Sequence, residues 1–256
     1  MIMRPKPSKK RRGPTLRGRA TKILAVSVKR AIKTEIGMQV ETKASCMSSS
    51  DGQQVLHNNF VTRVTNILST SQGTSDNMGN NQLNRVGDEV KCLGVSIKMM
   101  LELNERYSMG TFRIFVVRAA KGDVPTKSTL FSNLSTNKMI DTLNTERFTI
   151  LASKTCVIRQ SSFAIDPAII QTIGSGFAVG TQQISRATKI VKLWIPGKKF
   201  GRNGKIRYES GSTQVKFFDH HLLVYAYSNY DTGEATTAFY VGRVNDEVIQ
   251  MFYKDA

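Results

Sequence analysis

Apolar residues occupy every second position in one stretch, and this alternation constrains the fold more than any other feature. The alternating residues are Leu93, Val95, Ile97, Met99, Leu101 and Leu103. Successive side chains of a strand point to opposite faces, so the pattern predicts a half-buried β-strand rather than a helix. Residues 112–117, FRIFVV, predict a second strand. With a turn at 104–110, the two strands are expected to form a long antiparallel hairpin.

Further segments rich in β-forming residues extend along most of the chain. They are 56–68, 147–158, 187–195, 220–228, 236–244 and 248–253, and a short helix is expected near 127–143. About seven to nine strands with long loops and little strand–helix alternation predict an all-β antiparallel fold, either a sandwich or a barrel. We expect Trp194, Tyr225 and Tyr227 to belong to its core, because they lie in apolar strands.

The first 34 residues form a basic arm without a single acidic residue. The protein has 256 residues with 37 Lys+Arg against 19 Asp+Glu, and the first acid is Glu35. The arm holds twelve cations, which are Arg4, Lys6, Lys9, Lys10, Arg11, Arg12, Arg17, Arg19, Lys22, Lys29, Arg30 and Lys33. Such a block of like charge repels itself, so the first part of the arm is expected to be disordered. Residues 15–34 have the spacing of a basic amphipathic helix. We therefore divide the chain into an arm (1–40), a Ser-rich linker (41–54) and a β domain (55–256).

The natural partner of such an arm is a polyanion, because neutralising phosphates releases condensed counterions whatever the base sequence. A solubilising tail, or a nuclear-import signal at the KKRR of residues 9–12, are the alternatives. No membrane association is expected: no stretch approaches the 18 consecutive apolar residues of a membrane span, and the arm helix has no large aromatic face.

A second basic segment, 197–207, resembles a phosphate-binding loop only superficially. The position five places before Gly204-Lys205 is Lys199 instead of Gly, and Ile206 stands where Ser or Thr is required. We interpret the segment as a basic hairpin loop between strands. Its cations either contact nucleic acid or are simply solvated, and they are Lys198, Lys199, Arg202 and Lys205, with Arg207 beyond.

Nothing in the sequence assembles a catalytic or metal site, so we expect no enzyme activity and no cofactor. His220 and His221 are adjacent in a strand and should point to opposite faces, and His57 has no partner in sequence. All three are expected to be hydrogen-bonded or at the surface. The three cysteines are far apart without a CxxC pair, which indicates neither a disulfide framework nor a zinc site. Structural calcium is not indicated.

Several short motifs resemble the coat proteins of very small icosahedral viruses. These include satellite viruses of the tobacco necrosis type and circular single-stranded DNA viruses with a replication initiator. The motifs are the arm helix RATKILAVSVKRAIKTEI, NRVGDEVKCLGVSIKMML from Asn84, FRIFVVR, RFTILASKT from Arg147, and the C-terminal FYVGRV and MFYKDA. The resemblance implies one eight-stranded jelly roll of two four-stranded sheets. Its strands would be B (55–68), C (89–103), D (111–118), E (147–158), F (187–195), G within 205–218, H (220–228) and I (236–253), interrupted near Asn245-Asp246.

The resemblance further implies a capsid protein that assembles as a homo-oligomer, a T=1 shell of about sixty copies, and packages single-stranded nucleic acid with its arm. DNA is favoured over RNA, and the expected locations are the virion and, during infection, the host nucleus. The alternative is a non-viral, monomeric nucleic-acid-binding β domain with a basic tail. A jelly-roll enzyme or lectin is a third class, which the lack of clustered His and carboxylates disfavours.

Overall fold

The computed structural model describes residues 24–29, 31–32, 41–73, 84–104, 107–160, 187–228 and 240–255. The chain divides into two units, 1–41 and 42–256. In the first unit, residues 24–29 and 31–32 are helical, as the amphipathic spacing predicts. Their apolar side chains Leu24, Val26, Val28 and Ile32 are exposed. The remainder of the predicted arm helix lies outside the described residues.

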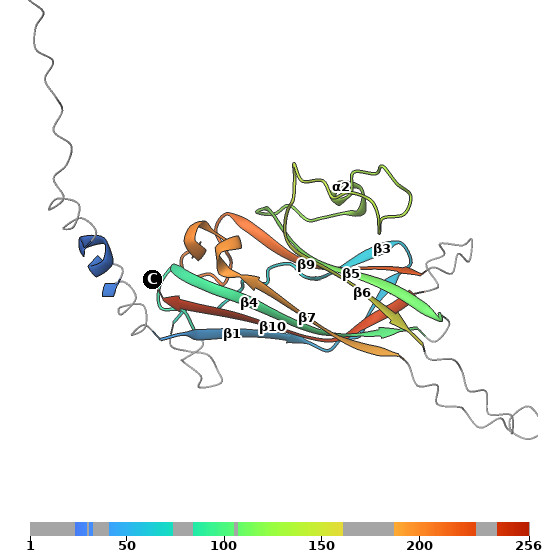
Figure 1. Cartoon of the computed structure of the whole chain (residues 1–256), viewed down its shortest axis with the longest axis horizontal. Helices are drawn as coiled ribbons and strands as arrows, with labels where there is room; N and C mark the ends of the chain where they lie inside the picture. The colour runs from blue at the N-terminus through green and yellow to red at the C-terminus, as the bar shows by residue number, and fades with distance from the viewer. Residues whose placement is uncertain are drawn as a thin grey trace, which may run out of the picture. The chain divides into compact units, whose positions relative to one another are not determined.

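The second unit is a stack of two antiparallel sheets (Figure 1). The first sheet has the order β1-β10-β4-β7, with the short strands β2 paired to β10 and β8 paired to β4. Its strands are β1 (Lys43–Ser49), β2 (Gln53–Leu56), β4 (Glu89–Leu103), β7 (Thr188–Pro196), β8 (Lys205–Arg207) and β10 (Tyr240–Asp255). The second sheet has the order β3-β9-β5-β6. It comprises β3 (Asn59–Val64), β5 (Met109–Ala120), β6 (Thr149–Arg159) and β9 (Phe218–Ser228).

This strand order is that of a jelly roll, which confirms the predicted fold class. Apart from the short strands β2 and β8, the described residues form eight strands, which take the letters B to I in chain order. The first sheet then has the order B-I-D-G and the second the order C-H-E-F, as in a jelly roll. The predicted letters are wrong from B to G, however. Strand B is β1, which lies in the segment predicted to be a linker. Each strand that was predicted as B, C, D, E or F is therefore one letter later in the structure, from C to G. Strand G is thus β7, and residues 205–218 supply only the extra strand β8. Strands H and I keep their places.

The interruption expected in the last strand is a β-bulge. β10 continues through it, and its pairing with β4 shifts register between Val244 and Asp246. One extra residue in one strand of a pair bends that strand without ending the ladder. The two segments predicted at 236–244 and 248–253 therefore belong to one strand in their described parts.

The predicted hairpin between 93–103 and 112–117 is wrong, because β4 and β5 belong to different sheets. β4 ends at Leu103 in one layer, and β5 begins at Met109 in the other. Leu101 and Leu103 of β4 then face Phe112 and Ile114 of β5 in one apolar core between the layers, where all four are fully buried. Alternation had identified the core face of β4 from Val95 to Leu103, but not the strand's partner. The prediction is wrong at Leu93, which is 37% exposed while Cys92 is buried, because the pairing with β10 shifts register there.

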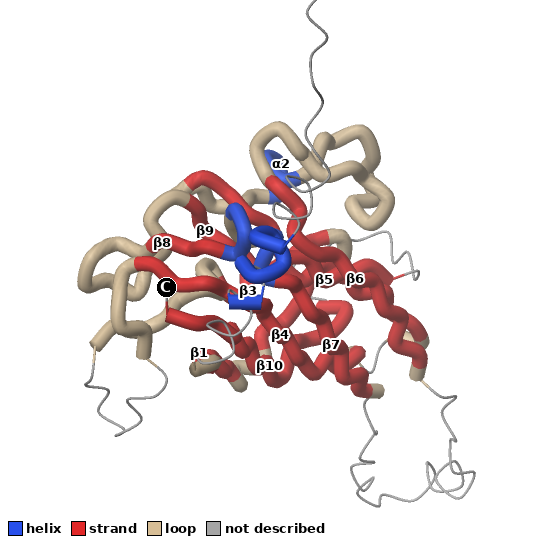
Figure 2. The backbone as a smooth tube through the Cα atoms, turned by 60° about the vertical axis from the view of Figure 1, so that its left-hand side comes forward, coloured by secondary structure: helices blue, strands red, loops and turns tan. Residues whose placement is uncertain are grey.

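The outer face of the second sheet is covered by the connection between β5 and β6. This connection includes α2 (Lys127–Leu130), which is shorter than the helix expected over 127–143, and it lies over the strands in Figures 1 and 2. Leu130, Phe131 and Phe148 pack there against Phe115 and Tyr225 in a second apolar cluster. Each such side chain stabilises the fold by about 1.5–3 kcal/mol through burial.

Lysine side chains join the two sheets along the edges formed by β6 and β7. Lys154 of β6 donates to the backbone carbonyl of Lys192, 2.8 Å away, and Lys189 of β7 donates to the carbonyl of Val157 at 2.9 Å. Lys199 donates to the carbonyl of Leu151 at 2.6 Å. The three ammonium groups therefore occupy carbonyls of edge strands, which would otherwise be free to pair with another strand.

Candidate nucleic-acid interface

The structure describes one of the twelve arm cations. Lys29 lies in the helical residues 24–29 and is exposed, so its ammonium group can reach a phosphate. The other eleven lie outside the described residues, and their role stays a prediction.

The second basic segment folds as two tight turns followed by β8, instead of a simple hairpin loop. The turns are η2 (Gly197–Lys199) and η3 (Arg202–Gly204), both 3-10 helices. Glycine is needed here because the backbone lies directly on β4. A Cβ on Gly197 would lie 2.0 Å from the carbonyl oxygen of Cys92, and Gly204 has a φ of +78° and a similarly close approach of 2.6 Å. The glycine spacing thus reflects packing against the sheet.

The four predicted cations of this segment have different surroundings. Lys199 is engaged by the carbonyl of Leu151. Lys205 forms an ion pair with Glu89, whose other oxygen lies 2.9 Å from Nε of Arg207. These two partners, Lys205 first, hold the pKa of the Glu89 carboxyl below its usual value. The side chains of Lys198 and Arg202 are exposed and form no hydrogen bond or ion pair with any residue that the structure describes. They remain available to a ligand.

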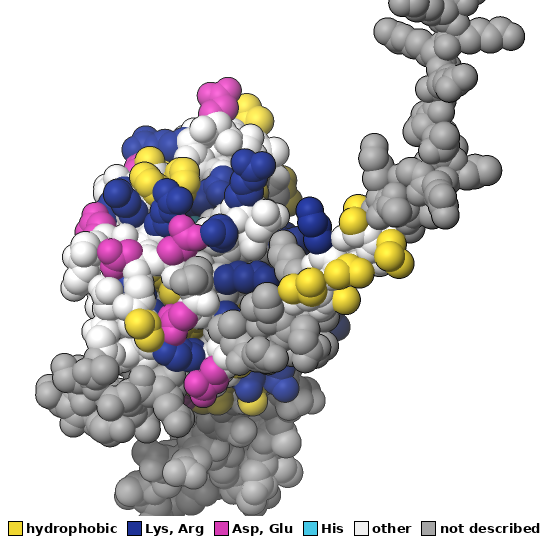
Figure 3. Space-filling model, turned by 90° about the vertical axis from the view of Figure 1, so that its left-hand side faces the viewer, with side chains coloured by type: hydrophobic (Ala, Val, Ile, Leu, Met, Phe, Trp, Pro, Cys, Tyr) yellow, Lys and Arg dark blue, Asp and Glu magenta, His cyan; other side chains and the backbone are white. Residues whose placement is uncertain are grey.

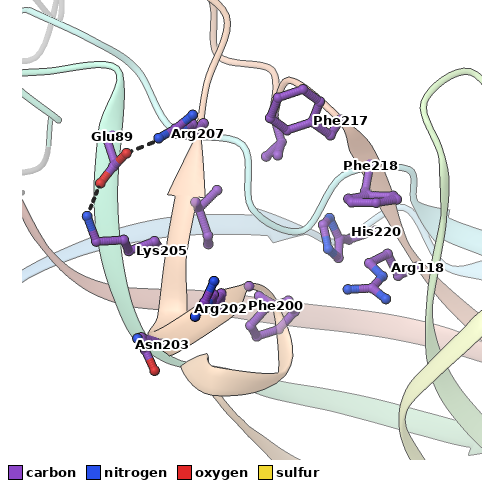
Figure 4. Close-up of a pocket in the computed structure, with 13 residues that line it drawn as sticks. Glu89, Arg118, Phe200, Arg202, Asn203, Lys205, Arg207, Phe217, Phe218 and His220 are labelled. Carbon is purple, nitrogen blue, oxygen red and sulfur yellow. Dashed lines mark hydrogen bonds and ion pairs between the residues drawn. The ribbon is translucent and has the colours of Figure 1, made fainter.

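Arg202 and Lys205 line a pocket of about 600 Å³ at one end of the two-sheet stack (Figure 4). Its other charged residues are Arg207, Arg118 of β5 and a single carboxylate, Glu89. Figure 3 looks at this end of the molecule and shows Lys and Arg side chains with apolar and acidic side chains between them. The excess of cations makes the pocket a candidate site for an anion.

Aromatic side chains form much of the pocket wall. Phe217 and Phe218 are exposed, at 53% and 41%, although large aromatic residues are usually buried. The guanidinium carbon of Arg118 lies 4.8 Å from the centre of the Phe218 ring. Figure 4 shows Phe217, Phe218 and Arg118 on the side opposite Glu89, Lys205 and Arg207. Cations and accessible rings thus face the same space.

His220 lies on the aromatic side of this pocket and is 1% exposed. Neither of its ring nitrogens has a partner with good hydrogen-bond geometry within the described part of the chain, although the Phe218 backbone lies near enough to act on its pKa. Its ring contacts the Phe200 ring edge-on at 5.5 Å, and it lies directly across the β5–β9 ladder from Arg118. Burial, and secondarily Arg118, lowers its pKa to about 3, so the imidazole is neutral at pH 7.

The expectation for the histidines holds for two of the three. The backbone N–H of Ser228 donates to Nδ1 of His57 at 3.2 Å, and His221 lies 3.1 Å from the carbonyl of Asp123 on the opposite face from His220. His220 is the exception, because it is buried and unpaired among the described residues.

The aromatic predictions are corrected at one position. Tyr225 is fully buried as expected, and Tyr227 packs partly against the second cluster, but Trp194 is 54% exposed. Trp194 lies on the outer face of β7, over Gly94 and next to the Phe252 ring at 5.9 Å. An apolar strand at a sheet edge can thus present an aromatic residue outward.

The motif that begins at Asn84 is structural. Arg85 is fully buried and stacks on Tyr208, with its guanidinium carbon 4.4 Å from the ring centre. It donates to the carbonyls of Ser212 at 2.5 Å and Glu209 at 3.3 Å. It therefore fixes the loop that leads from β8 towards the pocket, instead of contacting a ligand.

The fold and the pocket define an all-β, jelly-roll-like protein with a basic and aromatic pocket at one end of its sheets. Comparison with known protein families and with curated proteins found no match to this chain. Among the described residues, no three His, Cys, Asp or Glu side chains gather where they could hold a metal ion. Within the same residues, no helix has both the length and the apolar character needed to cross a membrane.

Proposed function

We propose that this protein is a viral capsid protein that self-assembles into a small icosahedral shell and packages single-stranded nucleic acid with its basic arm. One observation carries the proposal, namely the separation of a strongly basic, acid-free arm from a jelly-roll unit. The arm supplies sequence-independent attraction to phosphate, while the jelly roll supplies a rigid body that can be repeated in a shell.

The charge of the arm suits this role. A shell of about sixty copies would carry on the order of 700 positive charges on its arms, which matches a similar number of phosphates. Packaging would then depend weakly on base sequence and strongly on salt. DNA is the favoured genome, the virion is the proposed location, and the KKRR at 9–12 would serve nuclear import during infection. On this proposal the chain is not an enzyme.

The outer face of the first sheet supports self-assembly. Ile190, Trp194 and Val248 are exposed there at 67%, 54% and 39%. Apolar surface of this kind is typical of contacts between proteins, and a neighbouring subunit would cover it.

Negative-stain electron microscopy of nuclease-treated recombinant protein, with its 260/280 nm absorbance ratio, tests the proposal. We expect uniform closed particles that protect nucleic acid, and digestion of the extracted material with DNase or RNase then identifies the genome type. A clean monomer at every salt concentration and pH would instead support the tail-bearing monomeric nucleic-acid-binding domain.

Deletion of residues 1–34 tests the role of the arm. We expect loss of nucleic-acid retention with an unchanged far-UV circular dichroism spectrum, because the strands lie outside the deleted residues. An unfolded product would contradict the division into arm and shell domain.

A further inference from the structure

The pocket at the end of the stack is built by both sheets. β8 and η3 form one wall next to β4 of the first sheet, while Arg118 of β5 and His220 of β9 belong to the second. Its volume of about 600 Å³ lies within the range of about 300–1,000 Å³ typical of small-molecule sites. Rigid strands on both sides fix the relative positions of the groups that line it.

His220 indicates that the pocket suits a polar ligand. A buried polar group without a partner destabilises the protein, and both ring nitrogens of His220 lack one among the described residues. A neutral imidazole presents one N–H donor and one acceptor nitrogen. A ligand that reaches one of these nitrogens from the pocket would satisfy it, and the polar edge of a nucleic-acid base carries both donors and acceptors.

The aromatic residues favour the same class of ligand. Bases stack on accessible aromatic rings with little regard to sequence, and Phe217 and Phe218 are exposed beside His220. Arg118 over the Phe218 ring extends this surface with a planar cation, which also stacks on bases. A simple anion would make no use of the two rings.

The cations supply the phosphate contact. Arg202 is exposed without a partner among the described residues, whereas Lys205 and Arg207 are held by Glu89. Arg118 makes only a long contact of 3.4 Å to the hydroxyl of Thr149. Two guanidinium groups therefore remain available to a phosphate, which each can bind in a bidentate manner.

We propose that this pocket binds one unpaired nucleotide of a single-stranded nucleic acid. The base stacks on Phe217 and Phe218 with its polar edge at His220, and the phosphate binds Arg202 and Arg118. The inference deepens the proposed function by adding a second contact to the packaged strand. Binding of a nucleotide can nevertheless be measured whether or not shells form, so failure of one proposal is distinguishable from failure of the other.

Equilibrium dialysis of dAMP against the full-length, nucleic-acid-free protein tests the proposal, with deoxyadenosine and inorganic phosphate as separate probes. A mononucleotide has too little charge to exploit the counterion release that drives binding to the arm. We expect dAMP to bind more tightly than either fragment. Equal binding of phosphate and dAMP would reduce the pocket to an anion site, and no binding of dAMP at millimolar concentration would overturn the proposal.

Variants assign the binding to the pocket. Phe217→Ser and Arg202→Gln should each weaken dAMP binding at least about fivefold. Lys198→Gln is the matched control, because it removes an exposed, unpaired cation of the same segment that does not line the pocket. His220→Phe keeps an aromatic ring but removes both polar atoms, and should also weaken binding. Equal losses in Arg202→Gln and Lys198→Gln would overturn the assignment, provided that circular dichroism shows both variants folded.

Discussion

Replacing Arg63 by Met should lower the free energy of unfolding by about 3–5 kcal/mol, because it would leave a carboxylate buried without its cation. Arg63 of β3 and Glu247 of β10 join the two sheets, with Nε and Oε2 2.9 Å apart and both side chains 1% exposed. The second oxygen of Glu247 already lacks a partner among the described residues.

The double variant Arg63→Met, Glu247→Met separates the cost of an unpaired charge from the worth of the ion pair. Removing both charges should bring the stability back to within about 1–2 kcal/mol of the original protein, because the desolvation of both ions is also removed. Asp51→Asn is the matched control: Asp51 also contacts Arg63, at 2.7 Å, but its side chain is 62% exposed. This variant should remain close to the original protein.

Urea unfolding of unassembled subunits, followed by far-UV circular dichroism, measures these differences. The slope with urea should be the same for all variants, so that shifts in the midpoint report stability alone. Equal destabilisation of the single and double variants would refute the reasoning, because the loss would then come from side-chain packing rather than from a stranded charge.

Three further outcomes are expected. His220 has a pKa near 6.5 in the unfolded chain and about 3 in the folded chain, so only the unfolded chain binds a proton there between these pH values. The free energy of unfolding should therefore decrease by roughly 1.4 kcal/mol for each pH unit by which the pH is lowered from 6.5 towards 3. His220→Phe should remove this decrease, as measured by urea unfolding at about pH 7.5 and 4.5. Gly94→Val should displace Trp194, because a Cβ there would lie 2.2 Å from its ring; a red shift of its fluorescence emission would report this, and an unchanged spectrum would contradict it. Of the three thiols, a thiol reagent should modify only the exposed Cys46 in the native protein and all three in urea, because Cys92 is buried and its pKa is raised to about 12.

Period-two alternation predicted the strands whose two faces differ most. β4 has a row of buried residues facing the core and exposed residues such as Lys98 between them, so its sequence alone defined it. β1, with the sequence KASCMSS, has small and polar side chains that are only partly buried at a sheet edge. It therefore had no apolar rhythm to detect. Missing this one strand displaced every letter from B to G.

The candidate site was predictable only where its residues are neighbours in sequence. The basic segment containing Arg202 and Lys205 is visible as a run of cations between glycines. Arg118, Phe218 and His220 come from strands that meet this segment only in the folded chain. The pair Phe217-Phe218 beside Lys216 was the one available signal, an aromatic pair next to a cation at the start of a strand. Sequence periodicity does not say which strands pair within a sheet or which strands of the two sheets lie close together.

The lysine contacts along β6 and β7 have a consequence for how this chain can associate. Chains that add strand to strand at open edges grow without a size limit, as fibrils do. Here the ammonium groups of Lys154, Lys189 and Lys199 occupy edge carbonyls that such growth would use. Strand-to-strand association through β6 and β7 is thereby disfavoured, whereas contacts through sheet faces and loops, whose fixed angles suit closed assemblies, are not affected. Because β6 and β7 form one edge of each sheet, fibril-like growth would have to begin at the opposite edges, which are β1 and β3.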